Sequence, residues 1–145
     1  QEGGYRSGTE ATPAIFAFAA AAEAGIQTFR QDTAREKELL NSLCEKLSAL
    51  PGLVLTGAHE APHILNIAIP GVPTQNTINI LQDAGICVSA GSACAKGHRS
   101  HVLTAMGIPG ETIDSAFRVS LCRDNTQEEI DTLVEVIRRD ILPRI

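Results

Sequence analysis

Hydrophobic positions in this chain follow two patterns, one with helical spacing and one that alternates as in strands. The apolar side chains between Gln27 and Leu50 recur every three or four residues, which is the spacing of a helix with one buried face. From Ala116 to Leu121, apolar Phe117 and Val119 alternate with polar Arg118 and Ser120, as in a half-buried strand. The same criteria predict helices over 13–24, 27–50, 74–84, 101–106 and 127–141, and strands over 53–56, 64–69, 86–88 and 116–121.

Local end signals mark several of these elements. Thr12 followed by Pro13 is typical of a helix start, and Gly25 is expected to end that first helix. Thr74 and Ser100 are expected to cap short helices, and residues 126–129 (Thr-Gln-Glu-Glu) form a capping box.

The element order predicts one α+β domain. Helices come first, and strands then alternate with helices along 145 residues, a length that suits a single domain with its own core. We expect a small, mostly antiparallel sheet with helices packed on one face. Asn66 interrupts the apolar run at 64–69, so its side chain is expected either on the face opposite Leu65 and Ile67 or bonded to a neighbouring loop.

Composition narrows the possible functions. The chain is 43% hydrophobic and 20% charged, with a net charge of −5, which argues against non-specific nucleic-acid binding. No run approaches the ~18–20 apolar residues of a membrane span, and the polar, glycine-rich start is not a signal peptide. We therefore expect a cytoplasmic protein that binds neither membrane nor nucleic acid.

One of the four cysteines has a different setting from the others. Cys44 lies on a helical apolar stripe, and Cys87 and Cys122 lie in strand-like runs, so all three are interpreted as small buried hydrophobes. Cys94 lies among small residues between Gly91 and Gly97 and is expected in an exposed loop as a reactive thiol; a structural loop with an incidental thiol is the alternative.

Three arrangements give Cys94 a function. A metal site with Cys87, His98 and His101 matches no closed zinc pattern, so no metal is expected. A nucleophile–base pair with His98 lacks a residue to orient the histidine. The third is a cysteine nucleophile that works with Arg118, whose planar guanidinium binds carboxylates in a bidentate way; a solvated Arg118 is the alternative.

Four segments in register resemble a known family over essentially the whole chain. They are similar to the C-terminal part of cysteine desulfurases of the nitrogen-fixation and iron–sulfur-assembly type, which are class V aminotransferases that use pyridoxal 5'-phosphate. The segments are Arg-Ser-Gly-Thr at 6–9, Ser-Ala-Gly-Ser-Ala-Cys at 89–94, Ser-His-Val-Leu at 100–103 and Phe-Arg-Val-Ser-Leu at 117–121.

The resemblance implies a reaction and a role for three residues. L-cysteine would be converted to L-alanine, and Cys94 would take up the sulfur as a persulfide for iron–sulfur cluster or thiocofactor synthesis. Arg118 would bind the substrate carboxylate. Thr9 would reach the cofactor phosphate of the other subunit in a homodimer, and an iron–sulfur scaffold protein would accept the sulfur.

The chain also departs from the family pattern. The Ser-x-His-Lys motif that carries the cofactor lysine is absent, and Lys37, Lys46 and Lys96 do not match it. We therefore expect residues 1–10 to be an arm at the end of a missing large domain and 11–145 to be the C-terminal small domain, inactive alone. The alternatives are a non-catalytic persulfide carrier or interaction domain, and a parent enzyme that acts on selenocysteine or cysteine sulfinate.

Overall fold

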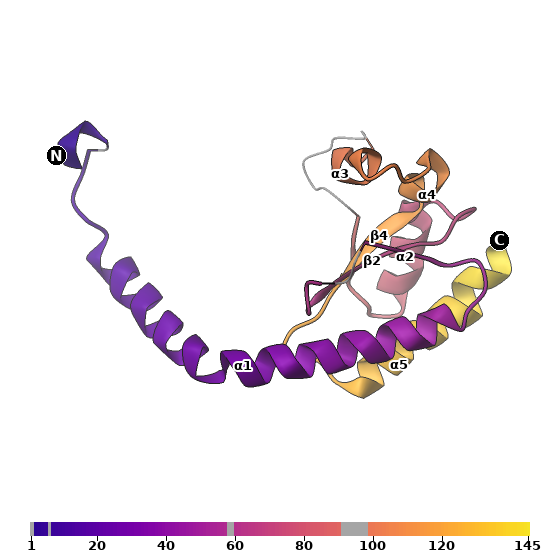
Figure 1. Cartoon of the computed structure of the whole chain (residues 1–145), viewed down its shortest axis with the longest axis horizontal. Helices are drawn as coiled ribbons and strands as arrows, with labels where there is room; N and C mark the ends of the chain where they lie inside the picture. The colour runs from indigo at the N-terminus through magenta and orange to yellow at the C-terminus, as the bar shows by residue number, and fades with distance from the viewer. Residues whose placement is uncertain (1, 6, 58–59, 91–98) are drawn as a thin grey trace. The chain divides into compact units, whose positions relative to one another are not determined.

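The computed structural model of the chain describes residues 2–5, 7–57, 60–90 and 99–145. The chain divides into two compact units, Gln1–Asp32 and Thr33–Ile145, and the boundary falls within the long helix α1 (Thr12–Ser48). Figure 1 traces both units along the chain.

The N-terminal unit consists of a short 3-10 helix, η1 (Glu2–Gly4), and the first part of α1. The predicted break at Gly25 is wrong, because α1 continues through it. A glycine ends a helix where it adopts a left-handed conformation, and Gly25 is not among the glycines with positive φ. The penalty of about 1 kcal/mol for a glycine inside a helix is too small to interrupt the ladder of hydrogen bonds on both sides.

The C-terminal unit is built on an antiparallel four-stranded sheet in the order β1-β2-β4-β3. Its strands are β1 (Val54–Thr56), β2 (Ile64–Ala68), β3 (Ser89–Ala90) and β4 (Ala116–Ser120). The expected strand at 86–88 is wrong by three residues, since pairing with β4 begins only at Ser89. The predicted α+β class with a small antiparallel sheet is confirmed.

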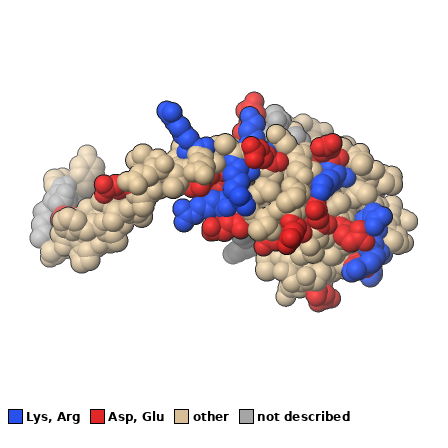
Figure 2. Space-filling model, turned by 90° about the horizontal axis from the view of Figure 1, so that it is seen from below, with Lys and Arg blue, Asp and Glu red and all other residues tan. Residues whose placement is uncertain are grey.

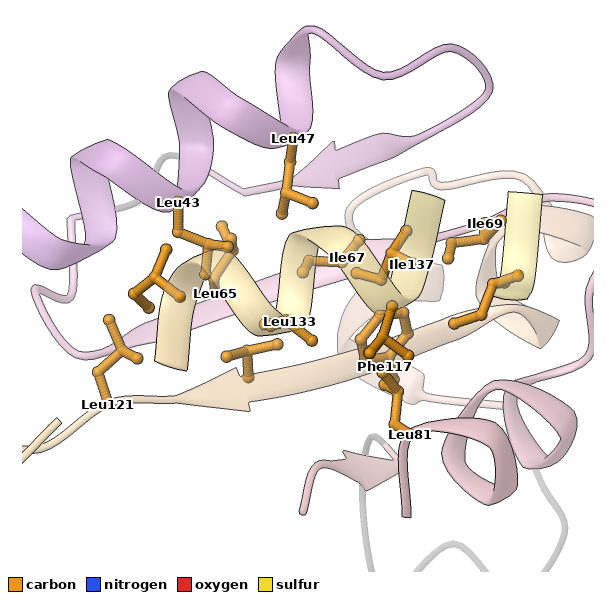
Figure 3. Packing of buried hydrophobic residues seen from close by; sticks show 14 of the residues in the cluster. Leu43, Leu47, Leu65, Ile67, Ile69, Leu81, Phe117, Leu121, Leu133 and Ile137 are labelled. Atoms are coloured by element: carbon orange, nitrogen blue, oxygen red, sulfur yellow. The ribbon is translucent and has the colours of Figure 1, made fainter. Parts of the chain in front are cut away.

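The main helices of this unit bury the face of the sheet that carries Leu65, Ile67, Phe117 and Val119. They are the second part of α1, α2 (Thr74–Asp83), α5 (Gln127–Val136) and the π-helical turn η2 (Ile137–Ile141), followed by η3 (Leu142–Arg144). Figure 3 shows side chains from α1, α5 and η2 converging on β2 and β4. The capping box at Thr126 and Glu129 is confirmed.

Two short helices form a second cluster at one end of the sheet, α3 (His101–Ala105) and α4 (Gly110–Asp114). Their Leu103 and Ile113 pack with Ala68 of β2 and Ala116 of β4. The Ser100 cap of α3 is confirmed, because its side chain accepts a hydrogen bond from the Leu103 amide. Helix α4 has no counterpart among the predicted elements, since five residues carry too little periodicity to detect.

Thr74 has a different role from the predicted cap. It is the first residue of α2, and its hydroxyl lies 2.9 Å from the backbone oxygens of both Asp114 and Ala116. The side chain therefore links the start of α2 to the segment between α4 and β4.

Charged side chains of both signs are interspersed on the face seen in Figure 2.

Residues 11–22, at the start of α1, contain no charged side chain. Within the described part of the chain, no helix combines the length and apolar character that crossing a membrane requires.

Candidate functional site

A row of four polar residues crosses the sheet on the face opposite the main core. Thr56 of β1 is the register partner of Asn66 in β2, and Asn66 is the register partner of Arg118 in β4. Ser89 of β3 pairs with Arg118 from the other side. Directly paired residues of an antiparallel sheet point to the same face, so one residue from each strand enters this row.

Arg118 is the only charged member of the row, and its guanidinium is incompletely satisfied. The side chain is half-buried, and its Nη2 donates a long hydrogen bond of 3.5 Å to the Ser89 hydroxyl. Its Nε is buried without a hydrogen-bond partner, and the described ranges contain no carboxylate paired with it. A half-buried guanidinium with an unpartnered donor is suited to receive an anion, because an unmet charged donor is costly.

The neighbouring Asn66 is held by Thr56. The Thr56 hydroxyl donates to Asn66 Oδ1 at 2.5 Å, and Thr56 itself is only 6% exposed. With Oδ1 occupied in this way, the amide has its Nδ2 donor group left for another partner. The expectation that Asn66 lies on the face opposite Leu65 and Ile67 is confirmed by the burial of those two residues and the pairing of Asn66 with Arg118.

Cys94 lies outside the described residues, as do Lys96 and His98. The residues on either side of this segment are positioned by the fold. Ser89, five positions before Cys94, lies beside Arg118. Arg99, five positions after it, is anchored to α4 by a bidentate pair with Asp114, with Nε–Oδ1 and Nη2–Oδ2 distances of 2.8 and 2.6 Å.

The pairing with Arg99 shifts the titration of Asp114. Hydrogen bonds from the guanidinium, together with its charge, hold the pKa of the Asp114 carboxyl below its ordinary value. Both side chains are exposed, so the pair fixes a position at the surface more than it adds stability.

Two of the other three cysteines differ from their predicted settings. Cys87 and Cys122 are exposed, so their interpretation as buried hydrophobes is wrong; Cys87 precedes β3, and Cys122 follows β4. Cys44 packs partly against the core, and burial raises the pKa of its thiol. Cys87 also lines a groove of about 380 Å³ between residues 84–88 and α5.

No metal centre is evident in the described part of the chain, where no three His, Cys, Asp or Glu side chains gather closely enough to bind an ion. His101 is exposed at the start of α3. Thr9 is exposed in the N-terminal unit, and its contact with the cofactor of a partner subunit stays a prediction.

The described residues do not by themselves fit pyridoxal phosphate. That cofactor needs a lysine for its Schiff base. Lys37 is exposed on α1, and Lys46 is paired with Asp131 on the surface between α1 and α5. Neither belongs to the row of polar residues that contains Arg118, so a lysine for the cofactor is not available among the described residues.

The sequence identified Arg118 as a candidate binding residue and Asn66 as an unusual residue within a strand. It did not identify Thr56. Thr56 ends a short apolar run, and nothing in the local pattern distinguishes it. Only the register of β1 against β2 reveals that it faces Asn66.

Comparison with known proteins gives a consistent result over nearly the whole chain. The family model described as aminotransferase class-V matches residues 1–133. A "Cysteine desulfurase" of Nostoc sp. is 36% identical over 94% of this chain and 36% of its own length. "Cysteine desulfurase NifS" of Azotobacter vinelandii is 34% identical over 94% of the chain and 35% of its own length.

Solved structures agree with the sequence matches. The X-ray structure of a NifS-like protein from Rickettsia africae superposes with a TM-score of 0.81 at 31% identity, covering 95% of this chain and 37% of that one. The chain thus spans about a third of the length of the relatives it matches. The family predicted from four sequence segments is confirmed. The chain belongs to the aminotransferase class-V family.

Proposed function

We propose that this chain is the C-terminal domain of a pyridoxal-phosphate-dependent cysteine desulfurase. The observation that carries the proposal is the unsatisfied guanidinium of Arg118 beside the strand that leads to Cys94. The relatives named cysteine desulfurase support the same assignment. Because those relatives are about three times longer, the activity belongs to the longer polypeptide.

Arg118 is the proposed binding residue for the substrate carboxylate. Its Nε and one of its two Nη amino groups would donate the two parallel hydrogen bonds that a carboxylate accepts from guanidinium. The half-buried setting strengthens this interaction compared with a fully solvated arginine, because less water competes for the donors.

Cys94 is the proposed sulfur acceptor. L-cysteine and the Cys94 thiol would give L-alanine and a Cys94 persulfide: the C–S bond of the substrate breaks, an S–S bond to Cys94 forms, and the proton lost by the Cys94 thiol is balanced by the proton that completes the methyl group of alanine. Pyridoxal phosphate bound in the longer protein would supply an electron sink for this reaction. Cys94 follows Ser89 by five positions, and five positions of extended chain span at most about 18 Å, so the strand that pairs with Arg118 lies within that reach of the thiol along the chain.

The cofactor lysine and most cofactor contacts would come from the part of the longer protein that precedes this chain. The N-terminal unit suits a position against that part. Ile15, Phe18, Ile26 and Phe29 recur along α1, and each is at least 56% exposed. Residues 1–10 would end the large domain, with Thr9 directed to the cofactor phosphate of the other subunit in a homodimer.

A persulfide must be protected from oxidation and passed on to another protein. We therefore propose a reducing, cytoplasmic location and a sulfur-acceptor partner such as an iron–sulfur scaffold. Iron–sulfur cluster or thiocofactor synthesis would use the sulfur.

The test is an assay of the longer polypeptide, loaded with pyridoxal phosphate, for alanine release from L-cysteine and for persulfide on Cys94. We expect both products from the parent, none from residues 1–145 alone, and no persulfide from Cys94→Ser. Equal release from selenocysteine or cysteine sulfinate would change the substrate assignment. Alanine release without Cys94 modification would refute the nucleophile assignment.

A persulfide carrier is the second candidate, supported by the position of the described lysines away from the Arg118 row. In that case the 145-residue chain would accept sulfur on Cys94 from a persulfide donor without releasing alanine. Mass analysis of Cys94 after incubation with such a donor, alongside the alanine assay, separates the two functions.

A further inference from the structure

The polar row contains a second group suited to a carboxylate besides Arg118. Asn66 lies directly opposite Arg118 in the β2–β4 register, and paired side chains of this kind have Cβ atoms about 4.5–5.5 Å apart. Asn66 interrupts a central strand whose other members are Ile, Leu and Ala, although asparagine is poorly suited to strands. Its presence therefore calls for a role that a hydrophobic residue cannot fill.

The hydrogen bonds within the row determine which of its polar groups remain available as donors. Thr56 donates to Asn66 Oδ1 at 2.5 Å, which leaves the Nδ2 protons of Asn66 as donors. At the other end, the Ser89 hydroxyl donates to its neighbour's carbonyl, Ala90 O, at 3.0 Å and is therefore free to accept from Arg118. Asn66 Oδ1 keeps a second lone pair, but Arg118 does not use it: its Nη2 donates to Ser89, and its Nε has no partner. Both Asn66 and Arg118 thus have donor groups available.

Two donor groups side by side can be satisfied by one shared acceptor. No described side chain supplies it, because Arg118 Nε is buried without a partner and Asn66 Nδ2 donates to no described residue. A negatively charged, planar group with two oxygens satisfies both donors at once, whereas a cation or a hydrogen-bond donor would be repelled.

We propose that Asn66 is a second binding residue for the substrate carboxylate and that Thr56 is the positioning residue that orients it. This inference rests on the proposed function, since it assigns Asn66 to the anion that Arg118 binds. One carboxylate oxygen would accept from Asn66 Nδ2 and the guanidinium would bind the same group from β4, so that strands β2 and β4 together define its position.

A purely structural explanation competes with this one: Asn66 could serve only to satisfy the buried hydroxyl of Thr56. The double variant Thr56→Val/Asn66→Leu separates the two explanations. Replacing both partners of a buried hydrogen bond by apolar groups of similar shape is close to neutral for stability. The double variant therefore keeps the fold and removes only the second donor.

The experiment follows acetate binding to the 145-residue chain by NMR at constant ionic strength, using the side-chain signals of Arg118 Nε–H and Asn66 Nδ2–H₂. Acetamide, the neutral analogue of acetate, is the control ligand. Ser120→Ala is the control variant, because Ser120 lies on β4 two residues from Arg118 and outside the row. We expect both signals to move with a single dissociation constant for acetate and not to move with acetamide.

The variants are expected to differ in their affinity for acetate. Acetate affinity should fall about tenfold or more in the double variant, the loss of one hydrogen bond to a charged group, and should be unchanged in Ser120→Ala. Thr56→Val alone should weaken binding, and Thr56→Ser should restore it, because serine keeps the hydroxyl that orients the amide.

Each other result overturns a specific statement. Unchanged affinity in the double variant, or an Asn66 signal that ignores acetate while Arg118 responds, refutes the role of Asn66 and leaves Arg118 as the carboxylate residue. Unchanged affinity in Arg118→Lys refutes the role of Arg118 instead. If neither signal responds in the unmodified chain, the row is no carboxylate site, and the alanine assay decides the proposed function separately.

Discussion

The guanidinium of Arg99 lies directly over the backbone of Gly110. A methyl group at residue 110 would meet Nη1 of Arg99 at 2.5 Å and its Cζ at 2.8 Å. The absence of a side chain at Gly110 therefore allows Arg99 to reach Asp114, and this pair anchors the first described residue after Ala90 to α4.

Gly110→Ala should displace Arg99 and break its pair with Asp114, since the end of a long side chain moves more easily than backbone. The pKa of Asp114 should then rise toward its ordinary value of 3.8. Measurement of the Asp114 carboxyl carbon by NMR during an acid titration tests this. A titration identical to that of the unmodified chain would contradict the contact.

Gly25→Ala should strengthen α1, because the site is helical and a Cβ there meets no atom within 4 Å. Alanine favours a helix interior over glycine by about 1 kcal/mol. Circular dichroism at 222 nm should show increased helicity, and Gly25→Pro should reduce it. A loss of helicity in the alanine variant would support a break at this residue.

Phe117→Ala should be among the most destabilising single changes in the C-terminal unit. Its ring is fully buried between β4 and the helices, and removal of such a side chain costs about 3–5 kcal/mol. Urea unfolding gives the free energy of unfolding. Val54→Ala is the control, because Val54 is 38% exposed on β1 and should cost about 1 kcal/mol or less.

The capping box of α5 should make stability depend on pH. Hydrogen bonds from the Asn125 side chain and the Thr126 amide hold the pKa of Glu129 below its ordinary value of 4.5. A carboxyl with a lowered pKa stabilises the fold above its unfolded pKa, and this contribution disappears as the pH falls through the folded pKa.

Thermal unfolding at a series of pH values tests this. Glu129→Gln should remove that part of the acid sensitivity, whereas Thr126→Ala should lower stability at neutral pH by about 1 kcal/mol. An unchanged acid profile in Glu129→Gln would exclude this carboxyl as a source of the dependence.

The three cysteines of the described ranges should react with iodoacetamide in a defined order. Cys87 and Cys122 are exposed, whereas Cys44 is partly buried and its pKa is raised by burial, so less of it is thiolate. Mass spectrometry after brief labelling at pH 8 should find Cys44 the slowest, and unfolding in urea should equalise the rates. Rapid labelling of folded Cys44 would contradict its packing.

Local signals in the sequence predicted the elements whose ends are decided by neighbouring residues. The box at Thr126 and Glu129 and the cap at Ser100 were predictable because each needs only a side chain and an amide three residues away. The alternation from Ala116 to Ser120 likewise placed Arg118 on the face opposite Phe117, because successive strand residues point to opposite faces.

Other features depended on contacts that a local pattern does not contain. Gly25 is a residue type that often ends helices, but α1 continues through it, and β3 begins at Ser89, where its pairing with β4 begins. The exposure of Cys87 and Cys122 follows from the limits of the paired strands and was missed for the same reason.

The sequence by itself determined the fold class, the family and the face on which Arg118 lies, since these follow from periodicity and from four motifs in register. Only the tertiary structure decided which residues share that face with Arg118. Thr56, Asn66 and Ser89 come from three other strands, and strand register arises from long-range hydrogen bonds that bring distant residues side by side.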